Sequence, residues 1–102
     1  MADQGKAVFK EKIKQLISNW QPSIHPFDIS LANLNLLSKK QTHEGLTKYG
    51  ESLDKSIKCY EDLEKFLIDS KCPLGNIQLA TRRIYILKGE KKWLTKFIKN
   101  YQ

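Results

Sequence analysis

Apolar residues recur at intervals of three and four along most of the chain, and this spacing predicts helices. In KAVFKEKIKQLISNW, residues 6–20, the apolar positions share one helical face while the lysines fall largely elsewhere. These positions are Phe9, Ile13, Leu16, Ile17 and Trp20. We therefore expect an amphipathic helix over residues 6–20, preceded by a disordered start at residues 1–5.

Two prolines separate this helix from the next one. Pro22 and Pro26 each push the residue before them out of the helical region, so QPSIHPF is expected to be a loop. Asp28 can cap the following helix, because its carboxylate can accept from the free amides of a first turn. That helix is predicted over ISLANLNLLSKK, residues 29–40. Its apolar residues cover a broad arc, which predicts burial on more than one side.

A third, longer helix is predicted after the polar break at residues 39–41, with Thr42 as its cap. Gly45 and Gly50 each weaken it by about 1 kcal/mol relative to alanine, so we expect it to begin properly only near Glu51. Residues 71–73 end it. Its inward positions form a heptad seam with one polar member. They are Leu46, Tyr49, Leu53, Ser56, Tyr60, Leu63 and Leu67.

The segment NIQLATRRIYILKG, residues 76–89, fits two kinds of element. Its apolar positions Ile77, Ala80, Ile84 and Leu87 share a helical face. The run RIYIL is β-branched and aromatic, which also suits a strand. We favour a helix, because no second strand is visible to pair with it. Gly89 is expected to break or bend the chain before the last segment.

These elements predict an all-α protein, a small bundle of four to five packed helices. The chain of 102 residues is interpreted as a single domain, residues 1–102. A chain of this length can form one hydrophobic core.

The chain is strongly basic, with a formal net charge of +7, and the charge is unevenly distributed. Residues 42–71 carry five lysines against seven acidic residues. Residues 72–102 carry seven basic residues against Glu90 alone. This distribution favours an acidic partner that binds the C-terminal third, which could be a protein, nucleic acid or anionic lipid.

The basic tail LKGEKKWLTKFIKNYQ divides into two faces when it is projected at about 100° per residue. One face carries the large apolar and aromatic residues Trp93, Leu94, Phe97, Ile98 and Tyr101. The other carries Lys88, Lys91, Lys92, Lys96 and Lys99. Nucleic-acid stacking surfaces interleave aromatic and basic residues, so we expect the apolar face to close the core instead. That use of the face also argues against membrane binding, because a membrane-surface helix needs its apolar side free.

Two arginines precede this tail. Arg82 and Arg83 add to the basic surface, but Arg83 projects into the apolar arc of its own helix. A cation in that position pairs with an acid of the middle helix, extends outward to solvent, or lies on a contact surface.

Motifs for catalysis or metal binding are absent from the sequence. Glu61, Asp62 and Glu64 alternate with lysines and are interpreted as a solvated helix face, where Glu61 and Lys65 have the spacing of a surface ion pair. The histidines and cysteines lack the close pairing of zinc sites. We therefore predict a non-enzymatic protein that needs no metal and no cofactor.

The location of the protein is predicted from its cysteines and its hydropathy. Cys59 and Cys72 belong to no CxxC motif and are expected to be free thiols. No secretory signal and no membrane-spanning run of about 20 apolar residues is visible. These features predict an intracellular protein, cytoplasmic or nuclear.

The run ISLANLNLLSKKQTHEGLTKYGESLDKSI, residues 29–57, combines a leucine-rich helix with Thr42, Leu46 and Leu53. In these features it resembles the small helical modules at the N-terminus of transcription elongation factors and in integrase-binding domains. The resemblance covers under a third of the chain and implies a transcription-linked interaction module.

Our first hypothesis is an interaction module that binds an acidic protein partner through a basic surface or a groove between helices. The alternative is sequence-independent binding of nucleic acid by the same surface. The heptad seam could also support a homodimer. The candidate binding residues are Arg82, Arg83, Lys88, Lys91, Lys92, Lys96 and Lys99.

Overall fold

The computed structural model describes residues 3–20, 22–23 and 25–101. Its regular elements are four α-helices and one short 3₁₀ helix, and no strand occurs among these residues. The prediction of an all-α protein is confirmed. The chain divides into two compact units, Met1–Asn33 and Leu34–Gln102. The prediction of a single domain stays a prediction.

The first unit contains helices α1, Asp3–Ser18, and α2, Pro26–Ala32. The predicted helix over residues 6–20 is confirmed, although α1 begins earlier and ends earlier. Residues 3–5 of the start expected to be disordered are helical, and residues 1–2 lie outside the described residues. All described side chains of α1 are exposed, including its apolar face.

Helix α2 begins earlier than predicted because His25, and not Asp28, is its N-cap. The amide of Phe27 donates to Nδ1 of His25 over 3.1 Å, and the amide of His25 donates to Oδ2 of Asp28 over 3.2 Å. These two bonds form a capping box, and Pro26 suits the first helical position because it lacks an N–H.

The predicted helix over residues 29–40 is therefore wrong in both its bounds. Helix α2 ends at Ala32, where the Asn33 side chain donates to the carbonyl of Ile29 over 2.7 Å. Residues Leu34–Leu36 form the separate 3₁₀ helix η1. The expected burial on several sides is also wrong, because no residue of α2 is buried.

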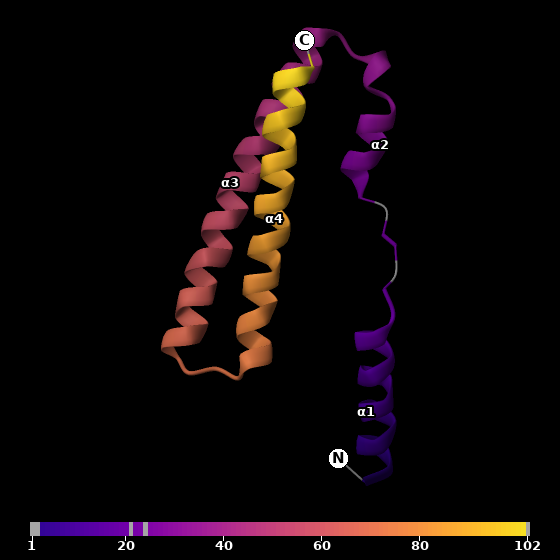
Figure 1. Ribbon diagram of the computed structural model, residues 1–102, viewed down its shortest axis with the longest axis vertical. Coiled ribbons are helices and arrows are strands. Elements are labelled where there is room, and N and C mark those ends of the chain that lie inside the picture. Colours follow the sequence, from indigo (N-terminus) through magenta and orange to yellow (C-terminus); the bar gives the residue numbers. More distant parts are fainter. Residues whose placement is uncertain (1–2, 21, 24, 102) are drawn as a thin grey trace. The chain divides into compact units, whose positions relative to one another are not determined.

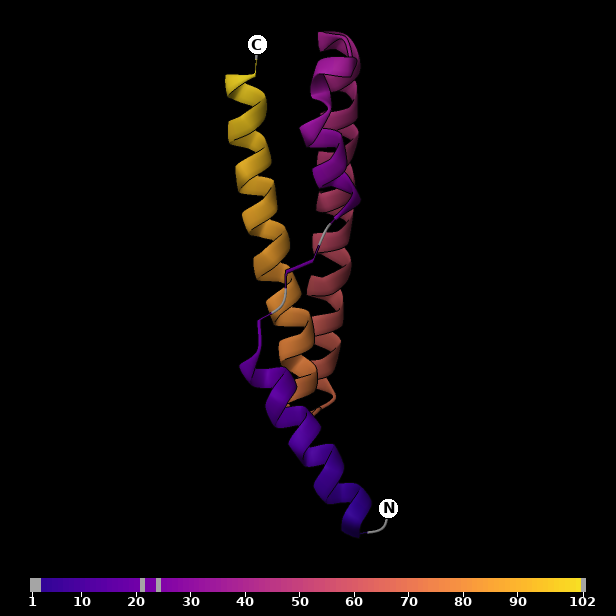
Figure 2. The same ribbon diagram turned by 90° about the vertical axis from the view of Figure 1, so that its right-hand side faces the viewer.

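The second unit is a helical hairpin of α3, Lys39–Asp69, and α4, Leu74–Asn100. The two helices lie side by side and run antiparallel, joined by a short connection (Figures 1 and 2). The amides of Lys71 and Cys72 donate to the carbonyls of Ile68 and Leu67, which is the pattern of a Schellman motif. Lys71 has the positive φ of 56° that this motif requires.

Helix α3 begins twelve residues before Glu51, so the prediction of a late start is wrong. Its N-cap is Ser38, whose Oγ accepts from the amide of Gln41 over 3.1 Å. The Gln41 side chain accepts from the amide of Ser38 over 3.0 Å and completes a capping box. This box starts the helix before the two weakening glycines are reached. Thr42 is consequently not the cap but a buried residue of the first turns.

Gly50 has a packing role that the sequence does not reveal. A Cβ atom at this position would lie 3.2 Å from Cδ2 of Leu94 and 3.2 Å from Nζ of Lys91. The glycine therefore lets α3 and α4 approach closely at this level. The close packing offsets the lower helix propensity of glycine.

The hairpin core combines the two faces that the apolar pattern predicts. Its buried apolar residues are Leu46, Leu53, Ala80, Ile84 and Leu94. The heptad seam of α3 is confirmed at Leu46 and Leu53, whereas Leu63 is exposed. Helix rather than strand is confirmed for residues 77–87. The expected break at Gly89 is wrong, because α4 continues through it without interruption.

The apolar face of the tail closes the core only in part. Leu94 is 1% exposed, whereas Phe97, Ile98 and Tyr101 are half-buried and Trp93 is exposed. The ring of Phe97 stacks on Trp93 with centroids 5.3 Å apart and lies 5.4 Å from the ring of Tyr101. The three rings thus form a row along α4.

Candidate functional site

Helix α4 carries three lengthwise stripes of residues, each with heptad spacing, because its positions repeat at about 100° per residue. The inner stripe is buried or half-buried against α3 and consists of Ile77, Ala80, Ile84, Leu87, Lys91, Leu94 and Ile98. The basic stripe is exposed and consists of Arg82, Tyr85, Lys92, Lys96 and Lys99. The mixed stripe consists of Leu79, Arg83, Ile86, Glu90 and Trp93.

Two of the predicted binding lysines are engaged within the hairpin. Nζ of Lys91 lies 3.1 Å from Oδ2 of Asp54 and 3.4 Å from the carbonyl oxygen of Gly50. Nζ of Lys88 lies 3.5 Å from Oε2 of Glu61. Both lysines therefore join α4 to α3, and neither belongs to the basic stripe.

The other predicted cations of the tail form the basic stripe together with Arg82. In the part of the chain that the structure describes, Arg82, Lys92, Lys96 and Lys99 have no ion-pair partner within 4.0 Å. The stripe contains no acidic residue. Its positive charges consequently face solvent without local compensation.

Tyr85 also belongs to this stripe, with a side chain that is 76% exposed. It lies between Arg82 and Lys92 in the heptad spacing of the stripe. Tyr85 precedes the tail, so the separation of aromatic from basic residues that was expected for the tail does not cover this tyrosine.

Arg83 lies apart from the basic stripe, in the mixed stripe on another flank of α4. It is exposed, and among the described residues it has no ion-pair partner. The sequence left three interpretations of Arg83 open: a pair with an acid of the middle helix, extension into solvent, or a place on a contact surface. The first is excluded for the acids of α3 that the structure describes. Its neighbours in the stripe, Leu79 and Ile86, are 75% and 43% exposed.

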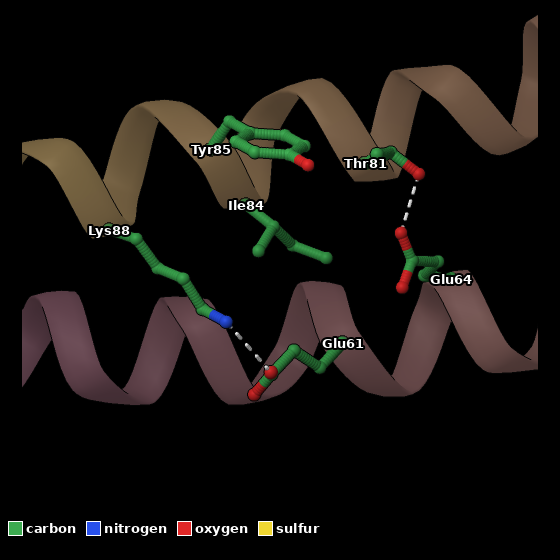
Figure 3. Close-up of a pocket in the computed structure, with 6 residues that line it drawn as sticks. All are labelled: Glu61, Glu64, Thr81, Ile84, Tyr85 and Lys88. Carbon is green, nitrogen blue, oxygen red and sulfur yellow. Dashed lines mark hydrogen bonds and ion pairs between the residues drawn. The ribbon is translucent and has the colours of Figure 1, made fainter.

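A small depression of about 270 Å³ lies between α3 and α4 (Figure 3). Glu61 and Glu64 of α3 point toward α4, where Lys88 pairs with Glu61 and the hydroxyl of Thr81 donates to Oε2 of Glu64. The predicted surface pair of Glu61 with Lys65 is wrong, because Glu61 instead binds the other helix. Both carboxylates are thus used to hold the helices together.

The remaining candidate chemistry is sparse. Cys59 and Cys72 are both free thiols, as expected, and Cys59 is exposed. Among the described residues, no group of three or more histidine, cysteine or acidic side chains is arranged to hold a metal ion. No helix in the same residues has the length and hydropathy to cross a membrane.

The sequence interpretation missed the mixed stripe. A detectable signal was present, since residues 79, 83, 86, 90 and 93 have heptad spacing. The two charged members, Arg83 and Glu90, interrupted the apolar pattern and concealed it.

Comparisons of the chain with protein-family models, with curated proteins and with solved structures found no match. The resemblance of residues 29–57 to modules of transcription elongation factors therefore stays a prediction.

Proposed function

We propose that this protein is a non-enzymatic interaction module whose basic stripe binds an acidic surface on a partner protein. The observation that carries the proposal is the set of exposed cations on α4 that have no acidic partner in the described residues. The hairpin uses its own carboxylates elsewhere, as in the pairs of Asp54 with Lys91 and of Glu61 with Lys88. The stripe therefore remains open to an external anion.

The dimensions of the stripe suit an elongated acidic surface. From Arg82 to Lys99 the helix rises about 26 Å, since each residue adds about 1.5 Å. An acidic helix of the partner could lie along this length with its carboxylates facing the lysines. Exposed charges of this kind accelerate association and favour partners of opposite charge. Their contribution to binding falls as the salt concentration rises.

A second candidate function is sequence-independent binding of single-stranded nucleic acid, and Tyr85 favours it. Its exposed ring lies among the cations of the stripe. A base can stack on such a ring while the neighbouring cations bind phosphates.

Charge reversal on the stripe tests both functions. The variant Arg82→Glu/Lys92→Glu/Lys96→Glu is compared with the matched control Lys48→Glu/Lys55→Glu/Lys65→Glu, whose substitutions lie on exposed positions of α3. The probes are a fluorescent glutamate-rich helical peptide, single-stranded DNA and RNA, and duplex DNA, each titrated at several salt concentrations. Circular dichroism checks that both variants remain helical.

We expect the peptide to bind the wild type and the control, and to bind the stripe variant at least about tenfold more weakly, a change of about 1.4 kcal/mol. Equal binding by the two triple variants would contradict a role for the stripe. Tyr85→Ala separates the two functions. It should leave peptide binding unchanged, whereas a marked loss of single-strand binding would favour nucleic acid.

A further inference from the structure

Helix α1 has an exposed apolar face. Its members within the helix are Phe9, which is 57% exposed, Ile13, 40%, Leu16, 63%, and Ile17, 81%. They span an arc of about 100°, because each helical residue advances by about 100°. Trp20, which follows the end of the helix, is 85% exposed and adds to this apolar surface. We call these five residues the α1 face. Apolar surface of this extent is typical of a contact with a partner or a membrane.

The length of α1 indicates that this face is covered when the helix is stable. The helix has 16 residues, and none of its described side chains is buried. A helix of that length is marginal alone in water, because most helical stability in proteins comes from packing of an apolar face. Helix α2 of the same unit contains no buried residue either. We therefore expect α1 to be stabilised by a surface outside its own unit.

The charges of α1 indicate the chemistry of that surface. In the same projection Lys10 lies about 20° beyond one edge of the α1 face, and Lys12 lies about 40° beyond the other. Neither lysine has an ion-pair partner within 4.0 Å among the described residues. Glu11 lies on the opposite side of the helix, where its Oε2 is 4.0 Å from Nζ of Lys14. Both edges of the face are therefore positive and open to an external anion.

We propose that α1 binds along the surface of an anionic membrane, with the α1 face at the boundary between headgroups and acyl chains. Lys10 and Lys12 lay their aliphatic stems along that boundary while their ammonium groups reach lipid phosphates. Lys6, which is in line with the face at its N-terminal end, extends its ammonium outward in the same way. Tryptophan prefers this boundary, which suits Trp20 at the other end of the face.

The lysines on both edges favour a bilayer over other occupants of the face. Two apposed copies of α1 would bring lysines together along the contact, with no acidic residue at its edges to pair them. A groove on a protein would need an acidic rim on each side of the helix, whereas an anionic bilayer supplies negative charge on every side.

This inference is independent of the proposed function, which rests on α4. The argument against membrane binding that the sequence provides concerns the apolar face of the tail, residues 87–102. The α1 face is separate from it and belongs to the first unit. An acidic partner on the basic stripe and a membrane on α1 therefore require different residues, and each can be removed without the other.

Vesicle binding of the full chain, followed by the fluorescence of Trp20, tests the proposal. The chain carries Trp93→Phe, so that Trp20 is its sole tryptophan. The probes are vesicles of phosphatidylcholine alone and vesicles with equal amounts of phosphatidylcholine and phosphatidylserine. With the anionic vesicles we expect a blue shift of the emission, protection from acrylamide and a gain in helical circular dichroism. Phosphatidylcholine alone should change each signal little.

Substitutions on the two sides of α1 test the role of the apolar face. In the same background, Ile13→Gln/Leu16→Gln should weaken binding to the anionic vesicles at least about tenfold, because two large apolar side chains no longer leave water. Glutamine has a good helix propensity, so the helix itself is not disfavoured. Val8→Gln is the matched control, since Val8 is 71% exposed but lies away from the face, and it should bind like the wild type.

Substitutions of lysine test the role of the charged edges. Lys10→Gln/Lys12→Gln should also weaken binding at least about tenfold, since each lysine near an anionic surface contributes about fivefold. Lys39→Gln/Lys40→Gln, on exposed positions of α3, has the same net charge and should bind like the wild type. Equal binding by these two variants would overturn the proposal, as would a Trp20 emission that anionic vesicles leave unchanged.

The remaining outcomes distinguish the other possible occupants. The stripe variant of α4 should keep the blue shift, and loss of the shift in that variant alone would assign the membrane contact to α4. Protection of Trp20 from acrylamide without vesicles would show that the chain covers the face itself. Loss of the glutamate-rich peptide in the Ile13→Gln/Leu16→Gln variant would assign the face to an acidic protein. Each of these three results would overturn the proposal.

Discussion

Thr42 gives a test of the hairpin in which a substitution should increase stability. Its side chain is 2% exposed, and its Oγ1 has no hydrogen-bond partner among the described residues. A buried hydroxyl without a partner loses its bonds to water and gains none in exchange. The substitution Thr42→Val removes this group and preserves the branched shape of the side chain.

The expected gain can be worked out from three contributions. An unsatisfied buried hydroxyl costs about 1–3 kcal/mol in protein substitution series. The methyl group that replaces it is apolar and gains up to about 0.8 kcal/mol from burial. Threonine and valine have nearly equal helix propensities, so that contribution is close to zero. We therefore expect Thr42→Val to raise the free energy of unfolding by about 1–4 kcal/mol.

Urea denaturation followed by circular dichroism measures this change. With a denaturant slope of about 2 kcal/mol per molar urea, the midpoint should rise by about 0.5–2 M. The protein concentration is held equal for all variants, because association would change apparent stability. Thr47→Val, on the exposed surface of the same helix, is the control and should shift the midpoint little. A loss of stability in Thr42→Val would refute the reasoning, since it would mean that the hydroxyl forms a bond in solution.

Four other substitutions test the packing and the helix ends of the hairpin. Leu94→Ala should lower the free energy of unfolding by about 2–5 kcal/mol, because Leu94 is 1% exposed and truncation leaves a cavity; a smaller loss in urea denaturation would contradict its central position. Gly45→Ala should stabilise α3 by about 1 kcal/mol, since its Cβ meets nothing within 4 Å. Gly50→Ala should gain clearly less in the same assay, because its Cβ lies 3.2 Å from Leu94, and an equal gain would show that the helices do not approach closely there. Lys71→Gly should raise the thermal midpoint, because glycine adopts the positive φ of 56° without the steric strain that a lysine has there, a contribution of about 1 kcal/mol. An unchanged thermal midpoint would argue against the Schellman motif.

Helix ends illustrate which local features the sequence predicted and which it did not. Asp28 and Thr42 were both suitable N-caps by residue type, yet the caps are His25 and Ser38. Each observed cap has a residue three positions later that completes a capping box. The pairing of two side chains with two backbone amides therefore decided the boundaries, and residue type alone did not.

The sequence predicted which cations the candidate site contains, but not which of them form ion pairs within the hairpin. The projection of the tail placed Lys88 and Lys91 with the other lysines. In the hairpin both reach carboxylates of α3, since Glu61 and Asp54 face them across the contact. Which cations remain open to a partner depends on the neighbouring helix, and the sequence of α4 contains no information about that neighbour.

By itself, the spacing of apolar residues determined that the chain is helical and which face of α3 and α4 is buried, because hydrophobic periodicity is a local property. The tertiary structure decided the rest. It brought Gly50 against Leu94 and left Thr42 buried without a hydrogen-bond partner among the described residues. These features depend on which residues of two distant segments come within a few ångströms of each other, and only the packing of the helices establishes that.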